Sequence, residues 1–145
     1  MKIFILLFIF LASLWSAQID DFASTVDYKR DYNTALKIAK QENKMLMLVV
    51  VADYCPWSKK FENKTLKNDS VSTLINENFI PVIIDKHRDE GSYPKMYKSP
   101  LIPAIFFIDP SSEQSVHKSL SYTKKRELIY TIDEAIKLFK VKQND

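Results

Sequence analysis

A chain of 145 residues is long enough for one α/β domain, and a second domain is not expected. Its 21 lysines and arginines are interleaved with 18 aspartates and glutamates along most of the sequence, and the net charge of +3 gives little support to nucleic-acid binding. Gly91 is the only glycine, which excludes the glycine-rich phosphate loops of nucleotide-binding proteins.

Residues 1–17 have the layout of a secretory signal peptide. A lysine precedes an unbroken apolar run over residues 3–12, and small residues follow the run. The run is well short of the ~20 residues that cross a bilayer. We therefore expect export, to a periplasmic or secreted location, and a mature domain of residues 18–145. Because Leu14 or Trp15 would occupy a cleavage position that prefers a small residue, an uncleaved anchor is the alternative.

The first elements expected in the domain are a surface helix and a buried strand. Apolar residues recur at helical spacing over residues 31–43, among lysine, glutamine and glutamate. Residues 45–52 (MLMLVVVA) are continuously apolar and rich in valine, as in a central strand covered on both faces by helices. Cys55 follows directly, and Pro56 suits the first turn of a helix that continues over residues 57–66. The sequence therefore predicts that Cys55 lies at a helix start.

The remaining elements are further strands and helices. Asn68 or Asp69 can cap the next helix, and a long polar connection over residues 86–99 adds nothing to the core. The C-terminal segment leans basic, and its charges at helical spacing are typical of a solvated face rather than a docking patch. The expected elements are a helix over 70–78, strands over 79–84, 104–109 and 114–121, and a final helix over 123–140.

This order of elements is that of a thioredoxin fold, and particular stretches extend the likeness. The segment ALKIAKQENKMLMLVVVADYCPWSKKFENKTLKNDSVSTLINENFIPVIID resembles the exported thioredoxin-like proteins, in which an A-x-x-x-A-K-x-x-x-K helix and a hydrophobic strand precede C-x-x-C-K-x-(M/F)-E. The resemblance resumes at KMYKSPLIPAIFFID, which is similar to the segment around the cis-proline of that family. It implies an α/β protein with a thioredoxin-like fold, built in three layers (α/β/α) around a central mixed sheet of four to five strands.

The resemblance assigns the attacking position of the C-x-x-C motif to Cys55, the only cysteine of the chain, and Ser58 stands where the family has its resolving cysteine. A serine hydroxyl has no redox couple, so an internal disulfide cannot form and the dithiol cycle is closed. The helix start, the nearby Lys59 and Lys60, and the Ser58 hydroxyl as a hydrogen-bond donor to sulfur all favour a thiolate. A buried structural cysteine is the alternative interpretation.

The resemblance also implies contacts with a client protein on both sides of the attacking sulfur. Trp57 lies inside the motif, where the family exposes its residues to substrate, and core packing is the alternative. Pro103 resembles the cis-proline of the family, and Ile102 is the preceding residue, whose backbone is free to pair with a bound substrate strand. Pro100 competes for this assignment, but its distance from the strand suits an ordinary turn.

Four further positions bear on the chemistry. Thioredoxins proper keep a buried acid six residues before the attacking cysteine, and here that position is Val49. Loss of the acid is coherent with loss of the resolving thiol. Asp53 is expected at the strand end facing water and takes no part in the expected mechanism. His87 and His117 lack further ligands at metal spacing, so neither a metal site nor another cofactor is expected.

These features predict an exported monothiol protein that forms mixed disulfides through Cys55 with cysteine-containing exported proteins. A small thiol or a membrane reductase would be the reductant, and neither nucleic acid nor stable membrane insertion after cleavage is expected. Isomerisation or reductive repair suits a single thiol better than net disulfide reduction. One alternative is a non-catalytic client-binding or chaperone module, like the C-x-x-S proteins of the anterior-gradient group. Another is an ordinary dithiol oxidoreductase in which Ser58 replaces a native cysteine.

Overall fold

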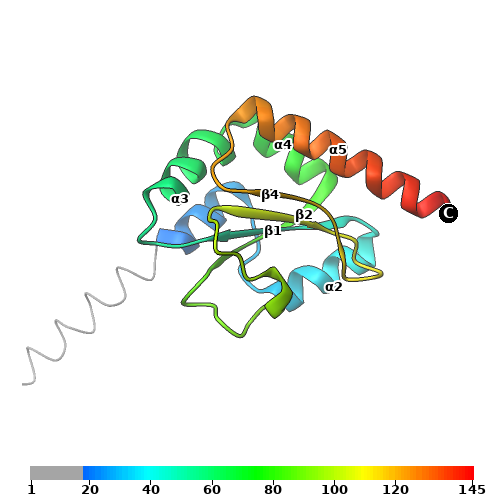
Figure 1. Cartoon of the computed structure of the whole chain (residues 1–145), viewed down its shortest axis with the longest axis horizontal. Coiled ribbons are helices and arrows are strands. Elements are labelled where there is room, and N and C mark those ends of the chain that lie inside the picture. Colours follow the sequence, from blue (N-terminus) through cyan, green and yellow to red (C-terminus); the bar gives the residue numbers. More distant parts are fainter. Residues whose placement is uncertain (1–17) are drawn as a thin grey trace, which may run out of the picture.

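The computed structural model describes residues 18–145, and the predicted signal segment, residues 1–17, lies outside the described residues. The strands are β1 (Met45–Val51), β2 (Phe79–Asp85), β3 (Ala104–Ile108) and β4 (Ser115–Leu120). They form one sheet with the order β2-β1-β3-β4 (Figure 1). β1 pairs in parallel with β2 and antiparallel with β3, and β3 pairs antiparallel with β4. The predicted mixed sheet is confirmed, with four strands.

β1 is buried along its whole length because both faces of the sheet are covered. Its residues alternate between two apolar clusters, as the pleat of a strand requires. Met47 and Val49 belong to one cluster, whereas Leu46 and Leu48 belong to the other. The run of apolar residues without charge thus reflects burial on both sides rather than one amphipathic face.

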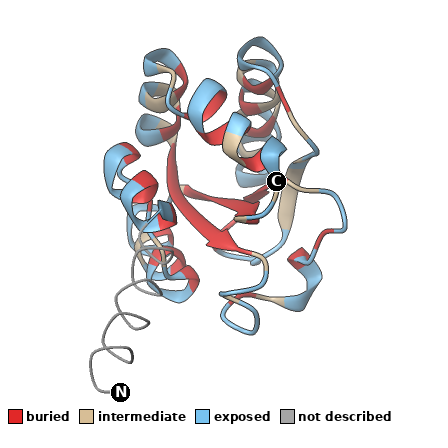
Figure 2. Cartoon of the chain, turned by 90° about the vertical axis from the view of Figure 1, so that its left-hand side faces the viewer, coloured by how far each residue is buried: buried red, intermediate tan, exposed pale blue. Residues whose placement is uncertain are grey.

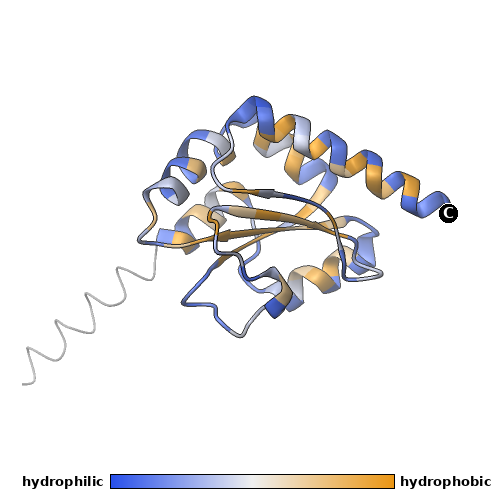
Figure 3. Ribbon diagram, viewed as in Figure 1, coloured by the Kyte–Doolittle hydropathy of each residue, from blue (hydrophilic) through white to orange (hydrophobic). Residues whose placement is uncertain are grey.

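Helices cover the two faces and complete three layers. The cluster with Met47 and Val49 includes side chains from several helices and the helical residues 18–26, whereas the cluster with Leu46 and Leu48 packs under α2. Figure 2 shows three buried strands, β1 to β3, between helices whose buried residues face inward, whereas β4 is largely half-buried. Figure 3 shows the apolar character of these three strands and the polar outer faces of the helices. Besides the helical residues 18–26, the helices of the described residues are α2 (Tyr32–Glu42), α3 (Pro56–Lys60), η1 (Phe61–Leu66), α4 (Asp69–Asn78), η2 (Lys95–Tyr97) and α5 (Lys125–Asn144).

Local side-chain contacts set the ends of the first helices. The Asp31 carboxylate accepts the backbone N–H of Thr34 at 2.7 Å and so caps the start of α2. Asn43 ends α2 in the left-handed conformation with φ of 50°. The Asn68 side chain caps α4 by accepting a backbone N–H, which confirms that this helix starts where its sequence indicates.

Two predicted helices differ in detail from those observed. The expected helix over residues 57–66 is α-helical only as far as Lys60 and then continues as the π-helical η1. At its end, the N–H of Lys67 bonds to the carbonyl of Glu62, five residues back, at 3.1 Å. The final helix extends beyond the predicted range to Asn144.

Residues 18–26, next to the predicted signal segment, form a helix that was not expected from the sequence. Ile19, Phe22, Ala23 and Val26 point into the core cluster of the α5 face. Their spacing of three and four residues is the signal that could have found this helix. Within residues 18–145, no helix combines the length and the apolar character needed to cross a membrane.

Candidate active site

Cys55 lies at the end of the sheet where three strands finish and one begins. The parallel register aligns Val51, the last residue of β1, with Asp85, the last residue of β2. In the antiparallel pairs, Val50 is opposite Ala104, and Ala104 is opposite Leu120. The segments that follow β1, β2 and β4 therefore meet the segment that precedes β3. The candidate site residues come from these four segments, and the one that follows β1 includes α3.

Cys55 itself is held by its backbone. Its N–H donates to the carbonyl of Ala52 at 3.0 Å, and its own carbonyl accepts the N–H of Lys59 at 3.3 Å. The residue is extended (φ −91°, ψ 111°), and Pro56 is the first residue of α3, which confirms the predicted helix start. The thiol is half-buried and forms no disulfide.

Ser58 is fully buried beneath the start of this helix. Its hydroxyl oxygen accepts the backbone N–H of Ala52 at 3.3 Å, which ties α3 to the end of β1. The predicted hydrogen bond from Ser58 to the Cys55 sulfur is not among the bonds of the described residues. Ser58 therefore has a structural partner of its own in the backbone.

The segment before β3 contains the candidate residues Ile102 and Pro103. Their peptide bond is cis, and no other cis peptide occurs in the described part of the chain, so Pro100 is not the cis-proline. Pro103 is buried and Ile102 half-buried. The Ser99 hydroxyl donates to the carbonyl of Leu101 at 2.7 Å and fixes the turn that leads into this segment.

One flank of Cys55 is a network of charges that neutralise one another. The Lys59 ammonium lies 3.7 Å from an Asp53 oxygen and 3.9 Å from an oxygen of Glu62. The Arg88 guanidinium contacts the other oxygen of Asp53 at 2.6 Å. We call Asp53, Lys59, Glu62, Asp85 and Arg88 the paired flank. Lys59, predicted to support the thiolate, thus directs its charge to two carboxylates, and Asp53 has a structural role that its expected exposure did not suggest.

Asp85 connects the loops on the paired flank. Its carboxylate accepts backbone N–H groups of Asp53 at 3.0 Å, His87 at 2.9 Å and Arg88 at 2.9 Å. Burial alone would raise the pKa of Asp85, but these three N–H groups and the Arg88 charge outweigh it and hold the pKa below its ordinary value. The carboxylate therefore fixes the loop before Cys55 against the loop after β2.

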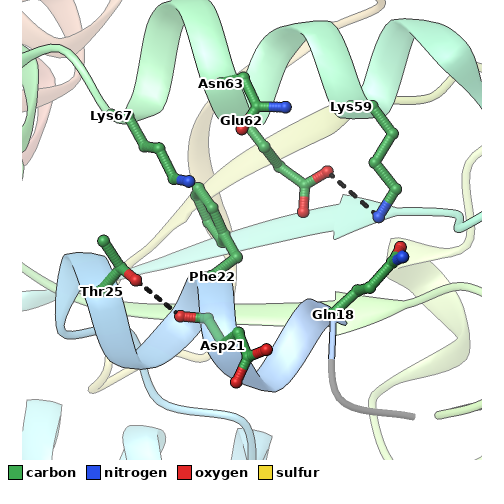
Figure 4. Close-up of a pocket in the computed structure, with 8 residues that line it drawn as sticks. All are labelled: Gln18, Asp21, Phe22, Thr25, Lys59, Glu62, Asn63 and Lys67. Carbon is green, nitrogen blue, oxygen red and sulfur yellow. Dashed lines mark hydrogen bonds and ion pairs between the residues drawn. The ribbon is translucent and has the colours of Figure 1, made fainter. Parts of the chain in front are cut away.

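Glu62 is a buried acid that the sequence analysis did not single out. It is 3% exposed, and its Oε2 atom accepts no hydrogen bond. Burial raises its pKa, and the nearby Lys59 ammonium only partly opposes this effect. Glu62 lines a cavity of about 360 Å³ together with Asp21 and Thr25 of the facing helical segment (Figure 4). Its place in the C-x-x-C-K-x-(M/F)-E pattern was the available signal.

The opposite flank is aromatic. Trp57 is 54% exposed, so it is not a core residue, and its ring centre lies 5.4 Å from that of Tyr122. The Lys60 ammonium sits 5.1 Å from the Trp57 ring centre and 5.2 Å from that of Tyr122. Tyr122 also meets Phe61 edge-on at 6.4 Å. We call Trp57, Lys60 and Tyr122 the aromatic flank. Tyr122 has no sequence motif, and only the fold places it here.

The two histidines are in different places. The Nε2 atom of His87 lies 3.0 Å from the Tyr54 hydroxyl near the site, whereas the His117 ring stacks on Phe107 with centres 6.2 Å apart. Residues 18–145 contain no group of three or more histidine, cysteine, aspartate or glutamate side chains arranged to hold a metal ion.

Residues 27–110 match a protein-family model described as thioredoxin-like. Similar solved structures include a thioredoxin from Thermus thermophilus, with a TM-score of 0.64 and 18% identity over 75% of this chain and 86% of that one. DsbH oxidoreductase has a TM-score of 0.62 and 20% identity, covering 76% and 84% of the two chains. The oxidised C-terminal domain of DsbD from Neisseria meningitidis has a TM-score of 0.62 and 18% identity, covering 74% and 98%. At these identities the likeness shows the fold.

Curated relatives match a shorter stretch. Spermatogenesis-associated protein 20 of Rattus norvegicus is 38% identical over 48 residues, and the Mus musculus protein of the same name is 40% identical over 48 residues. Each match covers 33% of this chain, and the chain spans 6% of the length of these relatives.

Proposed function

Because the chain belongs to the thioredoxin-like family, we propose that it is an exported monothiol protein that forms mixed disulfides with client cysteines through Cys55. The observation that carries the proposal is the placement of the single thiol: half-exposed, at the start of α3, and at the same end of the sheet as Ile102 and Pro103. Ser58, at the position of the family's second thiol, is bonded to the backbone instead.

The chemistry that one thiol supports is exchange. The Cys55 thiolate attacks one sulfur of a client disulfide, a Cys55–client disulfide forms, and the other client sulfur leaves as a thiolate that takes up a proton. Since Ser58 cannot resolve this intermediate, a second thiol must attack it, either from the client or from an external thiol reductant. The first route isomerises the client, and the second reduces it and returns Cys55 to its thiol form.

Client contacts are assigned to residues on both sides of the sulfur. Trp57 offers an exposed indole face, and the Ile102–Pro103 segment is the edge along which an extended client backbone would lie. Lys59 contributes indirectly, because its ammonium holds Asp53 and Glu62 in place beside the reactive loop.

Export follows from the signal-like layout of residues 1–17, which would deliver the domain to the periplasm or the exterior. N-terminal sequencing of the protein released by osmotic shock should give a start at or near Ala17, Gln18 or Ile19. Recovery of an intact Met1 in the membrane fraction would instead mean a membrane anchor.

Trapping tests the reaction. Cells producing the exported protein are quenched with an alkylating agent, and disulfide-linked clients are identified with and without reductant. Clients that disappear with Cys55→Ala support exchange through this thiol. Clients that stay bound to Cys55→Ala, in complexes resistant to reductant, would establish a client-binding module and overturn the proposal.

Ser58→Cys asks whether this is a thioredoxin site that lacks only its resolving thiol. The double-cysteine protein should close an internal disulfide on mild oxidation and reduce insulin, which the natural chain should do poorly. The gain should be partial, because the buried Val49 supplies no acid to accept the proton of the new thiol. Loss of the Ala52 N–H bond to the Ser58 hydroxyl should cost about 1 kcal/mol of stability. A folded variant that stays reduced under oxidant would contradict this prediction.

A further inference from the structure

Cations without an acidic partner gather next to the aromatic flank. Glu127 is the acid nearest in the sequence to the cations at the start of α5, but its Oε2 accepts the backbone N–H of Lys124 at 3.2 Å. Glu62, between Lys60 and Lys64, is buried and faces Lys59 instead. The cations are exposed, and within residues 18–145 their side chains form no ion pair. We call them the basic patch, and they are Lys60, Lys64, Lys124, Lys125 and Arg126.

Two contacts join the two halves of the basic patch. The Thr65 hydroxyl donates to the carbonyl of Thr123 at 2.9 Å, which places η1 beside the residue before Lys124. The Tyr122 ring, one residue earlier, shares the Lys60 ammonium with Trp57. Cations that are far apart in the sequence therefore lie on neighbouring segments of the fold, and Lys60 connects them to the exposed indole two residues after Cys55.

We propose that the basic patch and the aromatic flank together dock an acidic segment of the client next to its reacting cysteine. This inference rests on the proposed function, because the client disulfide is what brings the segment to Cys55. An apolar client residue packs on Trp57, while aspartate or glutamate side chains reach Lys60 and the first turn of α5. Docking precedes the thiol-disulfide exchange and does not change which bonds form and break in that step.

Charge complementarity selects this occupant. On the paired flank each cation faces a carboxylate of the chain itself, so that side offers no unmatched charge. On the basic patch the matching anions must come from elsewhere. Like charges gathered on one surface raise the association rate of an oppositely charged partner, and salt screens the effect over about 10 Å at 0.1 M.

The test compares two peptides of equal length. Each has one cysteine, bound as a mixed disulfide to nitrothiobenzoate, and a neighbouring leucine; one carries aspartates and the other an equal number of lysines. Attack by Cys55 on the peptide sulfur forms the Cys55–peptide disulfide and releases the coloured thiolate. At low ionic strength the acidic peptide should react about tenfold faster, and the difference should largely vanish at about 0.5 M salt. Equal rates at low salt would overturn the proposal.

Charge-reversal variants test which cations cause the difference in rate between the two peptides. Lys125→Glu with Arg126→Glu should slow the acidic peptide about fivefold and speed the basic one. Acidic residues suit the first turn of a helix, so this variant should remain folded. The matched control, Lys37→Glu with Lys140→Glu, makes the same change in net charge at exposed positions elsewhere. An equal effect of the control would mean that net charge alone decides, and would overturn the proposal.

Two further experiments distinguish docking of the acidic segment from the disulfide exchange and from binding to a membrane. Cysteine-free versions of both peptides, with a fluorescent label, are titrated with Cys55→Ser and followed by anisotropy. Preferential binding of the acidic peptide, lost in the Lys125→Glu and Arg126→Glu variant, supports docking even if no peptide reacts with Cys55. Vesicles containing phosphatidylserine supply the other anionic partner. Sedimentation with these vesicles through the same cations, without a preference for the acidic peptide, would replace the client segment with a membrane surface.

Discussion

The two flanks of Cys55 use similar side chains in opposite ways. Lys59 and Lys60 are neighbours in the sequence, yet Lys59 lies between two carboxylates and Lys60 lies over two aromatic rings. The paired flank satisfies its charges internally, which fixes the loop that carries the thiol. The aromatic flank and the basic patch leave an indole largely exposed and, among the described residues, cations without an acidic partner. We infer from this difference that the paired flank positions the thiol, and we propose that the exposed side contacts the client.

Asp85→Ala should produce the largest change, because it removes the acceptor of three backbone N–H groups on the paired flank. We expect a loss of about 3 kcal/mol in the free energy of unfolding, measured by urea denaturation. Alkylation of Cys55 in the folded protein should also become faster as the loop loosens. Asp109→Ala is the control: this buried carboxylate caps a distant turn, so it should destabilise the fold without changing alkylation.

Tyr122→Ala tests the aromatic flank. Removing the ring that contacts Trp57 and Phe61 should cost about 1 to 2 kcal/mol and free the indole to change orientation. Tyr122→Phe keeps the ring and should stay within about 0.5 kcal/mol of the natural chain. If both variants lose equal stability, the hydroxyl rather than the ring would be the stabilising group.

Glu62→Gln should have a smaller effect that depends on pH. Burial raises the folded-state pKa of Glu62 above the unfolded value of about 4.3, so the native state binds more protons. The free energy of unfolding of the natural chain should therefore fall as pH rises from the unfolded pKa through the folded pKa. Glu62→Gln should remove this decline in denaturant titrations at successive pH values. Glu134→Gln, at an exposed ion pair, should retain it.

Asp85 should make the free energy of unfolding depend on pH in the opposite direction, which the same denaturant titrations measure. Its folded-state pKa lies below the ordinary value, so its contribution is present above the unfolded pKa and is lost as pH falls through the folded pKa. The natural chain should lose stability on that acid side, and Asp85→Ala should reduce the loss.

The smallest expected effect is the difference in the free energy of unfolding between Lys59→Met and Lys60→Met. The first leaves Glu62 without its counter-charge and should cost about 0.5 to 1 kcal/mol, whereas the second should cost less than about 0.5 kcal/mol. Both free energies come from the same urea titrations. A larger loss for Lys60→Met would reverse the assignment of position to one flank and contact to the other.

Much of the fold could be predicted from local patterns. The apolar run of β1, the caps at Asp31 and Asn68, and Pro56 at a helix start each depend on neighbours within a few residues. The helical residues 18–26 carry an equally local pattern, which directly follows the apolar run of the predicted signal and was not recognised as a separate helix. The change from α- to π-helix after Lys60 has no comparable signal, because it depends on how the helix packs against the rest of the domain.

The sequence by itself determined that the chain has one thiol, that the thiol follows a buried strand, and that the chain has no second thiol of its own to resolve a mixed disulfide. Only the tertiary structure decided which charges around that thiol are matched. Asp53 meets Arg88, and Trp57 meets Tyr122, across long separations in the sequence. The physical reason is that apolar periodicity records burial locally, whereas ion pairs and ring contacts depend on loops that meet only after the strands have paired.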